Sequence, residues 1–304
     1  MLKRFALLIS AFVAMGTVTA PATAATAKPF PVTVKSGGFT TTVKSQPKRI
    51  VSLSPAGTEI LFGVGAGKQV VAVDSLSNYP AAAPKTDLSA FTPSAEAIAA
   101  YRPDLVLMSA DATKAADVRS GLAALGIPVF MEKAPTDLNG AYAEMLLVGK
   151  VTGRTKEAQV LVVGMKKKIA AIIAKAKITK PIRFFHELDN GLYSVTSETF
   201  IGQVYKQIAP KSVNIADAAA TADSYGYPQL SAEYLVSSNP QVIFLADAQY
   251  GEDAKTVAAR AGYSALDAVK NGNVVALPAD VPSRWGPRLV NLYSVIAAAM
   301  AKVK

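Results

Sequence analysis

The sequence predicts an α/β fold made of two lobes of similar build. Short apolar runs alternate with helical patterns before Asp137 and again after Ile178, and this alternation favours βαβ units with largely parallel sheets. Between those two positions the strand signals vanish and two helical stretches follow each other. The third observation is a unit that occurs twice: residues 94–109 read SAEAIAAYRPDLVLMS, and residues 231–246 read SAEYLVSSNPQVIFLA.

The repeated unit predicts a helix, a proline and a buried strand. Each copy begins Ser-Ala-Glu and places a proline seven residues after the glutamate. In the first turn of a helix, the partial positive charge favours an anion by about 0.3–1 kcal/mol. Any α/β chain reuses helix, proline and strand, so the likeness could be incidental. The identical starts on either side of a long helix instead indicate lobes related by pseudo-symmetry, a geometry suited to enclosing a ligand.

The composition limits the classes of protein. A chain of 304 residues has room for two domains, and 51% hydrophobic with 18% charged residues excludes a disordered chain. The net charge of +10 suits nucleic acid, an anionic surface or an anionic ligand. The one tight basic run, residues 166–168, fits the solvated face of a helix, which argues against nucleic acid. The absence of cysteine excludes disulfides, thiolate metal sites, cysteine nucleophiles and a lipid-bearing cysteine.

Residues 1–27 are expected to form a secretory signal peptide. Lys3 and Arg4 precede an apolar stretch at 5–18, and two A-x-A cleavage patterns follow at 22–27. The stretch is shorter than the roughly 20 residues of a membrane span. We therefore expect an exported, soluble protein in the periplasm or at the extracellular face of the cytoplasmic membrane. Without an outer membrane, an uncleaved signal segment is the alternative tether.

The elements of the first lobe, residues 47–153, follow a lead-in at 28–46. The lead-in suggests one short strand near 39–44. Thr58 is a plausible helix cap and glycines end that helix. The expected order is strand 49–55, helix 58–67, strand 69–74, loop 77–86, helix and strand of the first repeat, helix 113–125 and strand 127–131.

A long helix and a second lobe follow. Two helical stretches meet at residues 149–153, and the second, within a linker at 154–180, would span roughly 35 Å if unbroken. Lys180-Pro181 ends it, and the second lobe covers residues 181–304. Its expected elements are strands 182–188 and 192–196, a helix from Thr199, the second repeat, a helix near 254–261, strand 273–278 and a helix from Pro287.

These residues resemble a known family. KRIVSLSPAGTEILFGVGAGKQVVAVDSLSNYP, followed by TPSAEAIAAYRPDLVLMS, is similar to the N-terminal lobe of class III periplasmic binding proteins, the helical-backbone receptors of ABC importers for iron chelates and cobalamin. GYPQLSAEYLVSSNPQVIFLAD resembles the matching part of the C-terminal lobe. The resemblance runs from about Pro47 to the C-terminus. It implies two α/β lobes with Rossmann-like sheets, bridged by one long rigid helix, with the ligand cleft between them.

The resemblance also implies a function. Such a protein captures a metal chelate as a monomer and delivers it to an ABC permease dimer that works with its ATPase. An aromatic cleft with few charges suits cobalamin, whereas arginines suit an anionic ferric siderophore or haem. Glu96 and Glu233, by their place in the motif, would dock into arginine pockets of the permease. The alternative is that both only favour their helix termini.

The resemblance implies a ligand cleft rich in aromatic residues. Aromatic rings offer flat apolar area, and two arginines can give forked donors to carboxylate or phosphate. The alternative for the segment at 280–288 is a lead-in to the last helix, with its final arginine at the exposed helix start. The residues expected at the cleft are Tyr79, Phe91, Tyr225, Tyr227, Arg284, Trp285 and Arg288.

The sequence favours a binding protein over an enzyme. His186 is the single histidine, and neighbouring strand residues point to opposite faces, so His186 and Glu187 cannot hold one ion. With Asp189, a metal site remains the alternative to a satisfied polar residue at a strand end. GVGAGK at 63–68 lacks the spacing of a phosphate-binding loop. We expect no cofactor and no metal of the protein's own. The alternative hypotheses are an exported α/β hydrolase and a scaffold protein.

Overall fold

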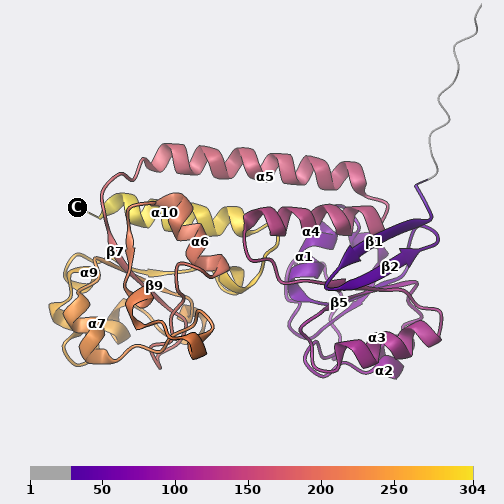
Figure 1. The fold of residues 1–304 in the computed structure, drawn as a ribbon, viewed down its shortest axis with the longest axis horizontal. Coiled ribbons are helices and arrows are strands. Elements are labelled where there is room, and N and C mark those ends of the chain that lie inside the picture. The colour runs from indigo at the N-terminus through magenta and orange to yellow at the C-terminus, as the bar shows by residue number, and fades with distance from the viewer. Residues whose placement is uncertain (1–28, 304) are drawn as a thin grey trace, which may run out of the picture.

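The computed structural model describes residues 29–303 and has two lobes lying side by side (Figure 1). The expected signal peptide, residues 1–27, lies outside the described residues. Each lobe holds one four-stranded parallel sheet with helices around it, which confirms the predicted α/β class. Within residues 29–303, no helix has both the length and the apolar character that crossing a membrane requires.

In the N-terminal lobe, helices cover both faces of the sheet. Alternate strand residues face α1 and α4 on one side and α2 and α3 on the other, so the strands are buried on both faces. The strands are β3 (Ile50–Leu53), β4 (Val70–Val73), β5 (Leu105–Ser109) and β6 (Val129–Glu132), in the order β4-β3-β5-β6. The helices are α1 (Pro55–Gly63), α2 (Ala95–Ala99), α3 (Ala115–Ala124) and α4 (Leu138–Val151).

The C-terminal lobe repeats this topology. Its sheet has the order β10-β9-β7-β8, so in both lobes the first strand lies between the second and the third, with the fourth outside the third. The strands are β7 (Arg183–Glu187), β8 (Val213–Asn214), β9 (Val242–Leu245) and β10 (Val274–Ala276). The helices are α6 (Phe200–Ile208), α7 (Ala232–Ser238), α8 (Ala254–Ala259), α9 (Asp267–Lys270) and α10 (Leu289–Lys302).

The two sequence repeats occupy equivalent places. Each forms the short helix, α2 or α7, that precedes the third strand of its sheet. Ser94 and Ser231 cap these helices, and each hydroxyl accepts the N–H three residues on. Arg102 and Asn239, which precede the prolines, both have a left-handed backbone, with φ of 47° and 43°. The left-handed residue directly follows α7, whereas in the first repeat α2 ends at Ala99 and a turn leads to Arg102.

The lead-in forms two strands where one was expected. β1 (Val32–Ser36) and β2 (Phe39–Val43) pair as an antiparallel hairpin that packs on α4 and β6. The hydroxyl of Thr41 donates to the carbonyl of Val129 at 2.7 Å. The first strand follows from the alternation in Val-Thr-Val-Lys, whose valines are buried.

Two local expectations were wrong. Ser54, not Thr58, caps α1: its hydroxyl accepts the N–H of Gly57, and Pro55 occupies the first helical position. Residues 192–196 form no strand but one isolated bridge between Tyr193 and Gln229. Short 3-10 helices fill the remaining connections, at Gly67–Gln69, Ile215–Ala219, Ala222–Ser224, Ala248–Tyr250, Tyr263–Ala265 and Val281–Ser283.

The helix α5 (Thr155–Ala176) follows α4 and leads directly into β7. Its 22 residues correspond to roughly 33 Å, and Figure 1 shows it extending over both lobes. Every third or fourth residue on its inner side is buried against α4 and α10. These inner residues are Ala158, Val162, Met165 and Ile169. They belong to one apolar core that includes strand residues of both sheets.

Candidate functional site

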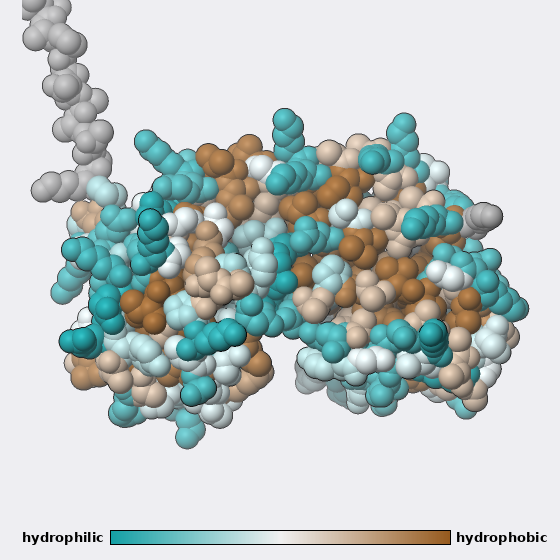
Figure 2. Space-filling model, turned by 180° about the vertical axis from the view of Figure 1, so that it is seen from behind, coloured by the Kyte–Doolittle hydropathy of each residue, from teal (hydrophilic) through white to brown (hydrophobic). Residues whose placement is uncertain are grey.

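A cleft of about 420 Å³ lies between the lobes. Figure 2 shows the molecule from behind, with a hollow between the two halves. The loops after β3, β4 and β5 form one wall, and the loops after β9 and β10 form the other. The carboxyl ends of parallel strands are where open α/β sheets bind ligands. Its lining includes Ser54, Phe91, Ser109, Tyr250, Arg284 and Trp285.

Three aromatic side chains line the cleft itself. Phe91 comes from the N-terminal lobe and is 70% exposed, whereas Trp285 and Tyr250 come from the C-terminal lobe. The sequence interpretation included the first two but missed Tyr250. The sequence does contain a signal for Tyr250: the residue lies a few positions beyond the strand of the second repeat, at the carboxyl end of β9.

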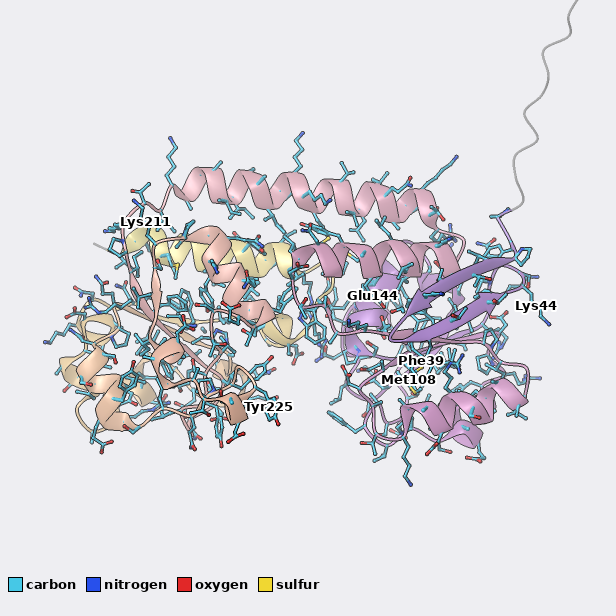
Figure 3. All side chains as sticks on the ribbon, viewed as in Figure 1. Phe39, Lys44, Met108, Glu144, Lys211 and Tyr225 are labelled. Carbon is cyan, nitrogen blue, oxygen red and sulfur yellow. The ribbon has the colours of Figure 1, made fainter. Side chains whose placement is uncertain are left out.

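Three other predicted aromatics lie outside this cavity. Tyr225 and Tyr227 are exposed on the loop that follows the 3-10 helix Ala222–Ser224. Figure 3 shows Tyr225 on the side of the C-terminal lobe that faces the N-terminal lobe. Tyr79 stacks against the guanidinium of Arg288, with 4.3 Å from the guanidinium carbon to the ring centre. Tyr225 is therefore placed at the rim of the hollow, and Tyr79 contacts an arginine of the other lobe.

The two predicted arginines are engaged by the protein. Arg284 is only 6% exposed and donates to the Asn78 amide oxygen at 2.7 Å and to the Leu76 carbonyl at 2.9 Å. Arg288 donates through Nε to the carboxylate of Glu59 at 3.0 Å, and this hydrogen bond raises the pKa of Arg288. Both arginines come from the C-terminal lobe and bind groups of the N-terminal lobe. The guanidinium N–H groups of both arginines thus link the two lobes, and most of these donors are already hydrogen-bonded to the N-terminal lobe.

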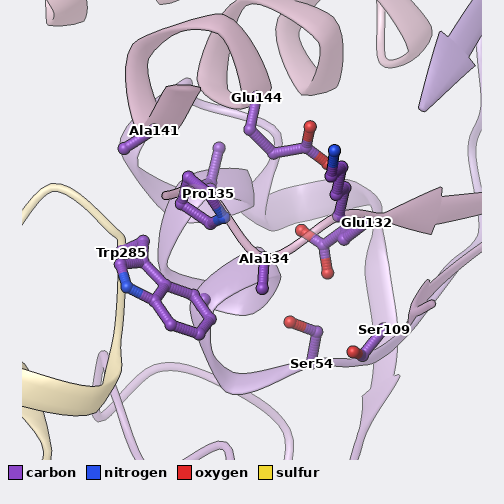
Figure 4. A pocket seen from close by; sticks show the side chains of 11 residues that line it. Ser54, Ser109, Glu132, Ala134, Pro135, Ala141, Glu144 and Trp285 are labelled. Atoms are coloured by element: carbon purple, nitrogen blue, oxygen red, sulfur yellow. The ribbon is translucent and has the colours of Figure 1, made fainter. Parts of the chain in front are cut away.

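Trp285 lines both the cleft and a smaller chamber of about 40 Å³ (Figure 4). Its ring meets Phe200 edge to face, with centres 6.1 Å apart. At the inner end lies Glu132, the last residue of β6, whose pKa burial and, secondarily, the charge of Glu144 raise to about 8. Burial likewise raises the pKa of Glu144 to about 7. The sequence interpretation missed Glu132, although this residue directly follows the apolar run predicted as a strand at 127–131.

The two glutamates expected to dock are exposed. Glu96 lies in the first turn of α2 and Glu233 in the first turn of α7. Figure 1 shows both helices at the ends of the lobes remote from α5. Backbone hydrogen bonding, together with the Ser94 hydroxyl 2.9 Å away, lowers the pKa of Glu96. Two exposed carboxylates thus occur on the same side of the molecule, one on each lobe.

His186 lies in the core. Its Nδ1 is 2.8 Å from the hydroxyl of Tyr205, and burial lowers the pKa of the imidazole to about 3. Glu187 points to the other face of β7, where Arg260 donates to both of its carboxylate oxygens. The two neighbours therefore face apart, as the strand period requires. Across residues 29–303, no three His, Cys, Asp or Glu side chains gather as candidate metal ligands.

Comparison with known proteins gives one family. Residues 50–281 match the model of a family described as periplasmic binding protein. The chain is 32% identical to an uncharacterised ABC transporter substrate-binding lipoprotein, YvrC, of Bacillus subtilis, over 86% of this chain and 82% of that protein. It is 31% identical to a cobalamin-binding protein of Halobacterium salinarum, over 97% of this chain and 84% of that protein.

A solved structure shares the fold. The periplasmic vitamin B12-binding protein BtuF of Vibrio cholerae superimposes with a TM-score of 0.69 at 23% identity. The match covers 85% of this chain and 99% of that one. The two-lobed arrangement in Figure 1 is therefore a known architecture.

Proposed function

Because this chain belongs to the periplasmic binding protein family, we propose that it captures a metal chelate outside the cytoplasmic membrane and delivers it to an ABC permease. The cleft between the lobes is the observation that carries this proposal. Its volume lies in the range of small-molecule sites, and it presents aromatic surface from both lobes. Such surface suits the flat face of a macrocycle.

Cobalamin is the first candidate ligand. The engagement of Arg284 and Arg288 with Glu59 leaves few cationic donors for an anionic ligand at the cleft. A largely neutral corrinoid fits such a lining better than a ferric siderophore or haem. Phe91 and Trp285 would contact it inside the cleft. Tyr225 and Tyr227 would contact the part that projects beyond the rim, and Tyr79 would support Arg288.

Delivery requires a second contact surface. We assign this role to Glu96 and Glu233, one on each lobe. Two carboxylates far apart on one side can meet two arginine pockets of a permease dimer, which fixes orientation as well as affinity. The protein would act as a monomer and without chemistry of its own. No lipid anchor is proposed, because the sequence has no cysteine to bear one.

Fluorescence titration tests the proposal. Trp285 is the single tryptophan and lines the cleft, so ligand binding should quench its emission in a saturable way. The purified protein is titrated with cyanocobalamin, haem and several ferric siderophores, and calorimetry on the same protein separates true binding from inner-filter loss of light. Cyanocobalamin is expected to bind most tightly. Silence toward every chelate in both measurements would refute a chelate-binding role.

A further inference from the structure

The small chamber adjoins the cleft. The two spaces share Ser54, Ala56, Ser109 and Trp285 as lining residues, so the chamber lies beside the place where a captured ligand would sit. Glu132 and Glu144 lie at its inner end (Figure 4). A water-sized group needs about 10–15 Å³ of such space, so about 40 Å³ holds roughly three non-hydrogen atoms.

Glu132 lacks a full set of partners. Its residue surface is only 6% exposed, and its Oε2 has no hydrogen-bond partner among residues 29–303. The carboxyl group lies directly against the first turn of α1, where a Cβ at Gly57 would collide with both of its oxygens. A buried carboxyl oxygen without a partner is costly, so a group entering from the cleft would gain a ready acceptor.

The Glu132 carboxyl group in its neutral form offers both kinds of hydrogen-bonding group. It donates through one oxygen and accepts through the other. The inner end of the chamber therefore presents a donor and an acceptor together.

The surroundings of Glu132 favour its neutral form. Burial opposes its ionisation most, the acids Glu144 and Asp74 add to this, and with a pKa of about 8 the group is mostly protonated at neutral pH. Lys133 is the one cationic residue among those lining the chamber. A ligand carboxylate would meet two acids here, and a ligand ammonium would meet a neutral group. A neutral group that both donates and accepts is the best match.

We propose that the chamber is a subsite for a primary carboxamide at the edge of the captured chelate, paired in both directions with the Glu132 carboxyl group. A carboxamide has three non-hydrogen atoms, which is the size the chamber admits. Its NH₂ donates to Glu132, its carbonyl accepts from the Glu132 O–H, and no charge is buried. This inference rests on the proposed chelate-binding function and adds a chemical requirement to it.

The test compares cyanocobalamin, which bears peripheral carboxamides, with its monocarboxylic derivatives, each with one carboxamide hydrolysed. For the wild-type protein, at least one derivative should bind about tenfold more weakly than cyanocobalamin. In Glu132→Leu, cyanocobalamin should bind about tenfold more weakly, and the gap to that derivative should close. Glu132→Gln keeps a donor and an acceptor, so it should bind within about threefold of wild type. Glu157→Gln, on the exposed side of α5, is the control variant.

The pH profile gives a second readout. Wild-type affinity should fall as the pH rises above about 8, where Glu132 loses its donor, whereas Glu132→Gln should show no such fall. Equal affinity of wild type and Glu132→Leu would overturn the subsite and leave the chamber to solvent. Absence of any chelate binding by the wild-type protein would instead overturn the proposed function, and the subsite with it.

Discussion

The carboxylate of Glu59, in α1 of the N-terminal lobe, accepts a hydrogen bond from Nε of Arg288, which directly precedes α10 of the C-terminal lobe, at 3.0 Å. Glu59 is fully buried in its side chain and also pairs with Arg284 at 3.4 Å. One buried acid therefore receives two guanidinium groups from the other lobe. Asp280, 3.1 Å from Arg284, completes the charge balance. The lobes are joined by this cluster as well as by α5.

Glu59→Gln should destabilise the protein by about 3–5 kcal/mol, because it leaves two buried guanidinium groups short of their anion. Urea unfolding at pH 7 measures the change. Glu157→Gln is the matched control: it breaks an exposed pair with Arg154 and should cost less than about 1 kcal/mol. Equal losses of unfolding free energy in the two variants would show that the buried cluster contributes no more to stability than an exposed ion pair.

Ligand binding should leave the angle between the lobes almost unchanged. The helix α5 and the Glu59 cluster both resist relative rotation, so closure would have to break a buried ion pair. Small-angle scattering with and without cyanocobalamin should show a change in radius of gyration below about 1 Å. A compaction of several ångströms would contradict a rigid connection.

Reversal of the two exposed glutamates should separate delivery from capture. Glu96→Arg combined with Glu233→Arg should leave chelate affinity unchanged and abolish uptake through the cognate permease, since an interfacial charge pair is worth about 2–5 kcal/mol. Glu157→Arg is the control, because this residue is also exposed in the first turn of a helix, α5, at the opposite side of the molecule. If the double variant still takes up the chelate, the two glutamates only stabilise their helices and do not dock to the permease.

His186 should make stability depend on pH in the acid range. Its folded-state pKa of about 3 lies below the ordinary value of 6.5, so the unfolded chain binds the proton first as the pH falls. The contribution is present above pH 6.5 and is lost toward pH 3, by up to about 1.4 kcal/mol per pH unit. His186→Asn retains a partner for Tyr205 and cannot titrate, so its unfolding free energy should fall less steeply from pH 7 to 4.5. Parallel curves would argue against a neutral buried imidazole.

The alternation of strands and helices was sufficient to predict the architecture. Buried parallel strands are continuous apolar runs, and prolines and glycines mark where they start and stop, as at Pro103 and Pro240. Competition between nearby residues explains the two local expectations that were wrong. Thr58 looked like a cap, but Ser54 with Pro55 caps better, and Thr58 instead bonds Ser52 and Ser77 in the core. Residues 192–196 do bond the segment at 226–230, where Ser194 donates to Pro228 and Thr196 to Gly226, but these bonds form only one isolated bridge and no strand.

The site was less accessible to sequence reasoning. Aromatic residues can be assigned to a cleft by their place after strands, as Phe91 and Trp285 were. Pairing between distant residues cannot be derived that way. Nothing in the local sequence links Glu59 to Arg284 and Arg288, more than 220 positions away, so the arginines looked free to bind a ligand. Burial of Glu132 likewise depends on how α1 and α4 close over the end of β6.

The core that contains α5 also includes residues of α10, among them Leu292, Ile296 and Met300, at the far end of the chain. During synthesis, the N-terminal lobe and α5 are complete long before that last helix emerges. Until then the inner side of α5 is only partly covered, by α4 and later by α6. Packing of the shared core is thus completed late. A chain that stalls near its end would expose the apolar inner side of α5 to chaperones and proteases.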